Sequence, residues 1–287
     1  MNSFNFRSIA RDLTIVENDL PGADALLKKL TFNKPNPIIG ITGPPGAGKS
    51  TLVNSLIELL LKDGNKIAVL AIDPTSPFNF GSLLGDRIRI ASHFNSPDVF
   101  IRSLATRGSL GGLSAKTIEM TDVLRAAGFD YILIETVGVG QWEIEIAGLA
   151  DITLVVLVPE SGDEIQHIKS GLMEITDAFI INKADRADAD VFANNLKKII
   201  GQKDGGQPPV FKTIASQVSG VNEVAAFIKL STKVRYQRHE LLMTEKAYKL
   251  IQQRLMRHIN KKKLQHDITE ALTDKKFNLY SFVDTYV

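Results

Sequence analysis

The feature that most constrains the fold is a glycine-rich octapeptide placed between a strand pattern and a helix pattern. Residues 43–50 read Gly-Pro-Pro-Gly-Ala-Gly-Lys-Ser and match the pattern G-x-x-x-x-G-K-[ST] at every fixed position. The apolar run at 37–42 predicts a buried strand before it, and the amphipathic pattern at 51–60 predicts a helix after it. This order favours a phosphate-binding loop over the alternative of an ordinary glycine-rich turn.

Such a loop supplies the groups that a triphosphate needs. Glycines let successive backbone N–H groups point at one phosphate, and the following helix adds its free N-terminal donors and its positive dipole. We expect Lys49 to reach the β- and γ-phosphates and the Ser50 hydroxyl to bind Mg²⁺. The residues predicted to bind nucleotide here are Gly43, Pro44, Pro45, Gly46, Ala47, Gly48, Lys49, Ser50 and Thr51.

Strand and helix patterns alternate through the middle of the chain. Near-continuous apolar runs, typical of strands buried on both faces of a mostly parallel sheet, occur at 37–42, 66–72, 98–103, 130–135, 152–158, 177–182 and 209–214. Helical patterns lie between them, at 50–62, 115–127, 163–174, 190–201 and 221–230. The order predicts a doubly wound α/β fold, in which ligands bind beyond the carboxyl ends of the strands.

Helical patterns without strands flank this region. Residues 3–30 read as helix broken at Pro21-Gly22, and 236–260 read as one long helix. Lys261-Lys262-Lys263 suits the C-terminus of that helix, and a second short helical stretch ends the chain. We therefore expect three parts: an N-terminal helical extension over 1–34, the α/β domain over 35–231 and a C-terminal helical arm over 232–287.

Charge is concentrated in the arm. Residues 231–287 carry 12 Lys and Arg against 6 Asp and Glu, whereas the whole chain has a net charge of +2. A basic tail can meet an acidic partner or nucleic acid. A solvated helix face is favoured instead, because aromatic residues do not alternate with the basic ones.

Composition limits the class of protein. The 287 residues are 44% hydrophobic and 23% charged, as in ordinary globular proteins. The absence of cysteine excludes disulfides and thiolate metal sites and fits a reducing compartment, so we expect a cytoplasmic location. The N-terminus lacks a secretory apolar run, and no run approaches the about 18 residues that span a membrane.

A second motif selects the base. The motif Asn182-Lys183-Ala184-Asp185 directly follows the apolar strand pattern at 178–181. A carboxylate at Asp185 accepts hydrogen bonds from guanine N1–H and the 2-amino group, and adenine would leave it buried and unpaired. Asn182 and Lys183 are expected to brace the loops around the base. The alternative, a helix-capping loop, is disfavoured downstream of a phosphate-binding loop, so GTP is predicted.

Acidic residues at strand ends predict a metal site. Glu135 ends one buried strand, with Gly138 three positions later. An acid there can hold Mg²⁺ through a water, and the Gly138 N–H can sense the γ-phosphate. Asp73 and Asp86 are further candidate metal ligands, although either alone is more often a loop acid.

Taken together, these strings resemble the MeaB/ArgK/MMAA family of P-loop GTPases. The resemblance covers roughly residues 5–230 and rests on residues 11–17, 43–51, 73–77, 84–89, 106–112, 135–141, 162–169 and 182–185. It implies a GTP-dependent chaperone that gates cofactor loading of an adenosylcobalamin-dependent acyl-CoA mutase, typically methylmalonyl-CoA mutase, and protects it. It also implies a homodimer with the C-terminal arm at the contact, and neither a nucleic-acid nor a membrane partner.

The resemblance assigns roles to particular residues. The Mg²⁺ shell would comprise Ser50, Asp73, Asp86 and Glu135, and GTP or GDP would be bound with it, adenosylcobalamin being held only by the partner mutase. A loop whose backbone contacts the base matches Ile214, Ala215 and Ser216, with Ile214 where the family usually has serine. Residues that resemble a switch touching the mutase are Gln141, Asp163, Glu164 and Lys169.

Hydrolysis is expected to be slow without a partner. Val139, rather than a glutamine, follows Gly138, and Gln141 lies further on. Phosphoryl transfer to water needs positioning and charge neutralisation, which a partner supplies by ordering the switches. Arg89 and Arg107 are candidates for moving toward the phosphates, or equally for structural ion pairs. The residues expected to act on the phosphates are therefore Lys49, Glu135, Gly138, Arg89 and Arg107.

Two alternatives remain open. The first is a P-loop kinase or ATPase of the basic amino-acid transport type, which needs an acceptor pocket and a base that no sequence element indicates. The second is a metal-insertion GTPase, which needs clusters of Cys or His ligands. The chain has no cysteine, and its five histidines are scattered without ligand spacing.

Overall fold

The computed structural model describes nine stretches of the chain, and all structural statements below concern these residues. They are 5–32, 36–73, 92–105, 115–136, 146–160, 176–201, 207–231, 239–273 and 277–286.

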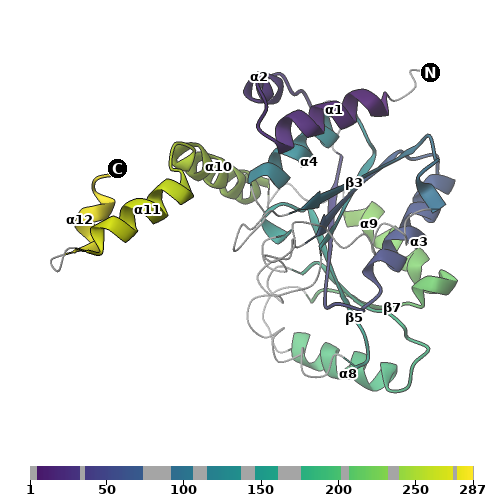
Figure 1. Cartoon of the computed structure of the whole chain (residues 1–287). Coiled ribbons are helices and arrows are strands. Elements are labelled where there is room, and N and C mark those ends of the chain that lie inside the picture. Colours follow the sequence, from purple (N-terminus) through teal and green to yellow (C-terminus); the bar gives the residue numbers. More distant parts are fainter. Residues whose placement is uncertain are drawn as a thin grey trace.

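A seven-stranded sheet forms the centre of the molecule (Figure 1). Its order is β3-β2-β4-β1-β5-β6-β7, and every neighbouring pair is parallel. The predicted α/β fold with a parallel sheet is confirmed, with strand ends shifted by one or two residues. The strands are β1 (Ile38–Thr42), β2 (Ile67–Asp73), β3 (Val99–Ala105), β4 (Tyr131–Thr136), β5 (Ile152–Leu157), β6 (Ala178–Ile181) and β7 (Val210–Lys212).

Helices cover both faces of this sheet, as doubly wound folds require. One apolar cluster joins the sheet to α3 (Lys49–Lys62) and α9 (Val221–Ser231). A second cluster, on the other face, joins it to α1 (Phe6–Glu17), α4 (Ala115–Ala127) and the 3₁₀ turn η2 (Ile146–Gly148). A third, smaller cluster packs α8 (Ala189–Ile200) beside β5 and β6. Alternate residues of β1 serve opposite clusters: Ile38 belongs to the second and Ile39 to the first.

Three aspartates fix the starts of the strands at the edge opposite the phosphate-binding loop. Each directly precedes a strand, and its carboxylate accepts the backbone N–H at or next to the start of the neighbouring strand. A charged acceptor makes a stronger hydrogen bond than a carbonyl, so these contacts hold the register of the sheet. The pairs are Asp130 with Lys66 at 2.8 Å, Asp151 with Ile38 at 2.8 Å and Asp177 with Thr153 at 2.7 Å.

The N-terminal helical pattern is interrupted as predicted. It forms α1 and α2 (Ala23–Lys28), and the break ends at Gly22, whose φ of 96° is accessible to glycine without strain. α1 packs on α4, and Phe6 at its start meets the rings of Phe100 and Phe129.

The predicted boundary between the C-terminal helices was wrong. α10 (His239–Met256) ends earlier than expected, and the three lysines begin α11 (Lys261–Ala271) instead of ending α10. Asn260 caps α11, since its side-chain oxygen accepts the N–H groups of Lys262 and Lys263 at 2.9 and 3.2 Å. An asparagine N-cap therefore outweighs the unfavourable placement of lysines at the positive end of a helix dipole. A further short helix, α12 (Leu279–Val283), follows.

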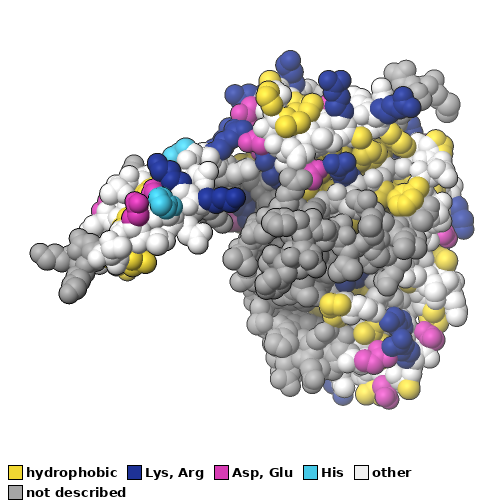
Figure 2. All heavy atoms as spheres, viewed as in Figure 1, with side chains coloured by type: hydrophobic (Ala, Val, Ile, Leu, Met, Phe, Trp, Pro, Cys, Tyr) yellow, Lys and Arg dark blue, Asp and Glu magenta, His cyan; other side chains and the backbone are white. Residues whose placement is uncertain are grey.

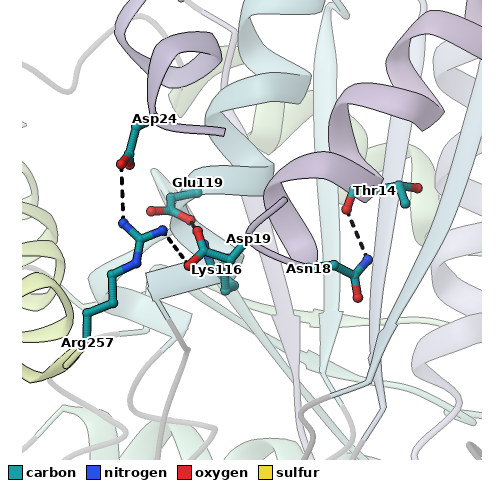
Figure 3. A network of polar contacts seen from close by, with 7 residues as sticks. All are labelled: Thr14, Asn18, Asp19, Asp24, Lys116, Glu119 and Arg257. Atoms are coloured by element: carbon teal, nitrogen blue, oxygen red, sulfur yellow. Dashed lines mark hydrogen bonds and ion pairs between the residues drawn. The ribbon is translucent and has the colours of Figure 1, made fainter. Parts of the chain in front are cut away.

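These three helices project from the α/β core (Figure 1), and two polar contacts hold their base. Lys246 of α10 is buried beside α4. At the end of α10, Arg257 pairs with Asp19 at 2.5 Å and with Asp24 at 3.2 Å, next to the α1–α2 turn (Figure 3). Lys116 of α4 joins the same network through Asp19 at 3.3 Å (Figure 3). The arm is thus tied both to α4 and to the N-terminal helices.

Apolar side chains along the arm remain exposed. Four apolar residues of α10 do not face the core, since all are more than half exposed: Leu241, Tyr248, Ile251 and Leu255. Lys and Arg side chains lie around the junction of the arm with the core and over the N-terminal helices (Figure 2). Within the described residues, no helix is both long and apolar enough to cross a membrane.

Candidate functional site

The candidate site lies at the carboxyl ends of the central strands, where a parallel α/β sheet binds its ligands. β1 leads into the phosphate-binding loop, β6 leads into the motif at 182–185, and β7 leads into the loop at 213–216. Together these segments enclose a pocket of about 250 Å³. Its lining residues are Gly48, Thr51, Asn182, Lys183, Asp185, Arg186, Ile214, Ala215 and Ser216.

Two glycines of the phosphate-binding loop occupy positions where other residues do not fit. Gly43 has φ of 138°, and a Cβ there would lie 2.0 Å from the Val156 carbonyl oxygen. Gly48 has φ of 85°, and a Cβ there would lie 2.3 Å from Asn182 Nδ2. Glycine at these positions therefore lets the loop pass close to β5 and to the motif at 182–185, which we call the base motif.

Lys49 begins α3 and is almost fully buried. Its ammonium donates to the carbonyl oxygens of Gly43 at 2.8 Å and Pro44 at 2.9 Å. These bonds hold the charge against the loop. The predicted contact with β- and γ-phosphates requires the ammonium to exchange these carbonyls for phosphate oxygens, which carry more charge and form stronger hydrogen bonds.

Ser50 and Glu135 lie together although 85 residues separate them in the chain. Ser50 belongs to the first turn of α3 and Glu135 to the end of β4, and the hydroxyl donates to the carboxylate at 2.6 Å. Both side chains are buried. A hydroxyl and a carboxylate are oxygen ligands that suit Mg²⁺, so these two predicted ligands fit the ion.

The rest of the predicted metal shell is not described at side-chain level. Asp73 is the last residue of β2, next to β4 in the sheet, and Asp86 lies outside the described residues. Among the described side chains, no group of three or more acidic or histidine residues gathers where a metal could bind. The pair Ser50 and Glu135 is therefore the part of the shell whose geometry is visible.

Asn182 joins the two halves of the pocket. Its amide nitrogen donates to the Ala47 carbonyl at 2.9 Å, in the phosphate-binding loop. Its amide oxygen accepts from the Thr213 hydroxyl at 3.1 Å and from the Ala215 N–H at 3.0 Å, in the loop after β7. One side chain, 2% exposed, thereby fixes the two loops relative to each other.

Both backbone polar groups of Ala215 are held. Its N–H is taken by Asn182, and its carbonyl oxygen accepts the Ser55 hydroxyl at 2.7 Å and the Val218 N–H at 3.2 Å. The resemblance directs the backbone of the loop at 214–216 at the base. The Ala215 N–H is engaged within the protein, and a contact of this loop with a base stays a prediction.

The pocket carries two cations beside Asp185. Lys183, with φ of 57°, donates to the Gly46 carbonyl at 2.7 Å, which closes the base motif over the phosphate-binding loop. Arg186 donates to Glu160 at 2.5 Å, and this hydrogen bond lowers the pKa of the Glu160 carboxyl. The sequence analysis did not predict that Arg186, Glu160 or Ser55 belongs to the site. The sequence indicates only Arg186, through its position next to Asp185.

Eight predicted residues fall on segments that the structure does not describe. They comprise the glycine after Glu135, the two candidate arginines, one metal ligand and the four residues of the partner switch. They are Gly138, Arg89, Arg107, Asp86, Gln141, Asp163, Glu164 and Lys169.

Sequence comparison finds relatives over most of the chain. The sequence model of a family described as "Methylmalonyl Co-A mutase-associated GTPase MeaB" matches residues 9–273. A Pyrococcus horikoshii protein named for GTPase activity is 49% identical over 232 residues, which are 78% of this chain and 73% of the relative. The GTPase ArgK of Escherichia coli is 35% identical over 229 residues, 76% of this chain and 69% of ArgK. The Mus musculus protein "Methylmalonic aciduria type A homolog, mitochondrial" is 37% identical over 205 residues, 69% of this chain and 48% of that protein.

Solved structures share the fold. The crystal structure of a protein named LAO/AO transport system kinase has a TM-score of 0.69 at 24% identity, covering 99% of this chain and 92% of that chain. HypB from Helicobacter pylori in complex with nickel has a TM-score of 0.54 at 20% identity, covering 78% and 97%. These likenesses concern the fold alone, and they agree with the predicted α/β architecture of a P-loop protein.

Proposed function

Because the chain belongs to the MeaB family of P-loop GTPases, we propose that it binds GTP with Mg²⁺, hydrolyses GTP to GDP and phosphate, and acts as a chaperone of an adenosylcobalamin-dependent acyl-CoA mutase. The observation that carries GTP binding is a single pocket in which Asp185 lies close to the phosphate-binding loop. Asn182 joins the two through a hydrogen bond to Ala47. The cytoplasmic location expected from the sequence belongs to the same proposal.

The phosphate half of the site is built on the start of α3. The loop amides and the N-terminus of α3 receive the phosphates, and Lys49 adds a charge that its buried position keeps from bulk water. Ser50 and Glu135, with Asp73 and Asp86, hold Mg²⁺. The bound ion neutralises the negative charge that develops on the phosphate oxygens.

The base half of the site reads guanine. Asp185 accepts hydrogen bonds from guanine N1–H and the 2-amino group, and Lys183 closes the motif over the loop through Gly46. The loop at 214–216 borders the pocket on the side of α3. Adenine would leave the Asp185 carboxylate without a donor at the base, which favours GTP over ATP.

Calorimetric titration with nucleotides tests this part of the proposal. With Mg²⁺ present, we expect GDP and a non-hydrolysable GTP analogue to bind at least tenfold more tightly than ADP and the matching ATP analogue, because a mismatched polar contact costs at least 1.4 kcal/mol, or about a factor of ten. Adenine nucleotides binding as tightly as guanine nucleotides would contradict it. That result would favour the alternative, a P-loop kinase or ATPase of the basic amino-acid transport type.

The mutase is proposed from the family. The family description names a methylmalonyl-CoA mutase-associated GTPase, and the named mouse relative concerns methylmalonic aciduria. We assign the contact with the mutase to Gln141, Asp163, Glu164 and Lys169. We propose that the γ-phosphate controls the conformation of these residues, and that Gly138, Arg89 and Arg107 act near the γ-phosphate.

Complex formation with a purified methylmalonyl-CoA mutase tests the partner. Size-exclusion chromatography with GDP and with a non-hydrolysable GTP analogue should give complexes whose amounts differ between the two nucleotides. If this protein elutes at the same volume with and without the mutase, in the presence of either nucleotide, this mutase is excluded as the client. An isobutyryl-CoA mutase would then be the next client to test in the same way.

A homodimer is proposed from the arm. α10, α11 and α12 expose large apolar side chains in a single projecting unit, which is typical of a surface that another protein covers. A second copy of the chain is the occupant that the family resemblance implies. The exposed residues are Leu241, Met243, Tyr248, Ile251, Leu255, Met256, Leu272, Leu279, Tyr280 and Val283.

A further inference from the structure

A buried hydroxyl connects the phosphate-binding helix to the base-binding loop. Ser55 lies in the second turn of α3 and is 4% exposed. Its Oγ lies 2.7 Å from the Ala215 carbonyl oxygen and 3.1 Å from the Thr51 carbonyl oxygen. A hydroxyl has one proton to donate. The shorter distance favours Ala215, which is 160 residues away in the chain.

This bond completes the support of the backbone of Ala215 at the edge of the pocket. Asn182 holds the N–H of Ala215, and Ser55 holds its carbonyl oxygen, so the peptide groups on both sides of this residue are held. The second lone pair of that oxygen accepts the Val218 N–H at 3.2 Å, within the same turn of the chain. Among the described residues, the bond from Ser55 is therefore the one that ties this carbonyl to another element of the structure.

The surroundings make the position of Ser55 itself rigid. It belongs to the helix that starts at Lys49, and its neighbours Leu52 and Leu56 are fully buried in the cluster that α3 shares with the sheet. Ala215 belongs to the same cluster. A hydrogen bond between two buried, packed groups fixes distance and direction, whereas apolar packing alone tolerates sliding.

We propose that Ser55 is a positioning residue for the base half of the nucleotide site: it places the loop at 213–216 relative to the phosphate-binding helix. The inference rests on the proposed binding of a guanine nucleotide. Contacts to a base depend on donors held to within a fraction of an ångström, so a loop released from α3 binds the base less well. The phosphates contact the start of α3, and the Thr51 carbonyl there is farther from the Ser55 hydroxyl, at 3.1 Å, than the Ala215 carbonyl at 2.7 Å. The single hydroxyl proton therefore serves the base loop rather than the phosphate end of the helix.

Ser55→Ala removes the hydroxyl and little volume. Two titrations in the presence of Mg²⁺ separate the halves of the site, one with GDP and one with inorganic pyrophosphate. We expect GDP to bind about fivefold more weakly, the effect of one lost hydrogen bond, and pyrophosphate to bind as before. A role of Ser55 in the shape of α3 alone would weaken both ligands equally.

Thr121→Val is the matched control. Thr121 is also fully buried on a helix, and its hydroxyl donates to the carbonyl four residues earlier, Thr117, at 2.6 Å. It lies on α4, among residues that do not line the pocket. The control variant loses a buried hydroxyl without touching the base loop, so both affinities should stay at their wild-type values.

Ser55→Cys provides a second variant if the alanine variant does not fold. Cysteine is a weak donor of similar size, so it should also weaken GDP binding while sparing pyrophosphate. Unchanged GDP affinity in a folded Ser55 variant would overturn the inference, and so would an equal loss for GDP and pyrophosphate. Wild-type protein that binds GDP no more tightly than ADP would instead contradict the proposed function.

Discussion

At the scale of single residues, the candidate site depends on side chains that connect loops. Asn182 uses both ends of its amide, one on Ala47 and the other on Thr213 and Ala215. Gly48 leaves room for this side chain, since any Cβ there would collide with it. The geometry of the pocket therefore depends on Asn182 before any ligand is considered.

Asn182→Ala should harm both stability and binding. The substitution leaves one buried carbonyl and two buried donors without this partner, and we expect the free energy of unfolding to fall by about 2–3 kcal/mol. GDP binding should weaken at least tenfold because the two loops are no longer joined, where tenfold corresponds to about 1.4 kcal/mol. Urea unfolding and calorimetry measure the two effects.

Asn65→Ala is the control for that variant. The Asn65 side chain donates to the Leu60 carbonyl near the end of α3, at 2.9 Å, which is its one side-chain bond among the described residues. Its loss should cost less than about 1 kcal/mol and leave GDP affinity unchanged. Equal effects of the two asparagine variants on GDP binding would contradict the connecting role of Asn182.

Asp185→Asn should change the preferred base from guanine to xanthine. An asparagine amide can donate to the oxygen at position 2 of xanthine, whereas it meets the 2-amino group of guanine as donor against donor. Titration with GDP and xanthosine diphosphate should show the order of affinities reversed. Asp188→Asn, three residues further on and without a side-chain capping bond, should keep the wild-type preference.

The site residues predicted from the sequence come from local motifs, because each motif is a short strand-to-loop unit whose chemistry is contained in consecutive residues. The structure brings parts of both motifs to one pocket, lined by Gly48, Thr51, Asn182, Lys183 and Asp185. Their contacts with a nucleotide stay predictions. Ser55 was not predicted, since its partner lies 160 residues away and its surroundings read as an ordinary helix. Asp151 likewise reads as a loop acid until the sheet places it beside Ile38.

At the scale of helices and strands, hydrophobic patterns predicted the sheet well. Strands buried on both faces leave continuous apolar runs, which local sequence shows directly. The predicted end of the long C-terminal helix was wrong, because another local signal was misread. The charge of Lys261-Lys262-Lys263 suggested a helix end, whereas the capping side chain of Asn260 determines a helix start.

Charged side chains lie where α10 docks on α4. Burial lowers the pKa of Lys246 and raises the pKa of Asp122, and each of these charges partly offsets the burial effect on the other. Arg125 on the same helix as Asp122, and Asp151 at the start of β5, also face this group. The buried Lys246 and the partly buried Asp122 thus attract each other at the base of the arm.

Lys246→Met should destabilise the protein most at neutral and alkaline pH. It removes the nearby cation that favours the charged form of the partly buried Asp122 carboxylate, and we expect a loss of about 1–2 kcal/mol near pH 8. The raised pKa of Asp122 means that the folded protein binds this proton more readily than the unfolded chain, so the loss should shrink as pH falls toward the ordinary value of 3.8.

Urea unfolding at about pH 5 and about pH 8 measures this difference. Lys263→Met, an exposed lysine of α11, should change the free energy of unfolding by less than about 0.5 kcal/mol at both. A Lys246→Met variant with the same loss at both pH values would contradict the role of Asp122.

At the scale of the whole molecule, the projecting arm distinguishes this chain from a minimal nucleotide-binding domain. α10 to α12 contribute little to the core clusters, apart from Leu250, and expose apolar side chains instead. Arg257 and Lys246 fix the base of the arm, so its outer part is presented in a defined direction (Figure 1). This arrangement suits assembly with a second copy.

Leu255→Lys should weaken the proposed homodimer. A charge introduced into an apolar contact must be desolvated, which should raise the dimer dissociation constant at least tenfold, or about 1.4 kcal/mol. Val191→Lys is the control, since Val191 is similarly exposed, but on α8. Sedimentation velocity should show the first variant dissociating at concentrations where wild type and control remain dimeric. A monomeric wild type would contradict the dimer.

We propose that the chain is a GTPase whose hydrolysis responds to an acyl-CoA mutase. The rate of phosphate release from GTP with Mg²⁺, measured with and without purified methylmalonyl-CoA mutase, tests this proposal. We expect slow release by the protein alone and at least tenfold faster release with the mutase, equivalent to a barrier lowered by about 1.4 kcal/mol. Fast release by the isolated protein that the mutase leaves unchanged would contradict it.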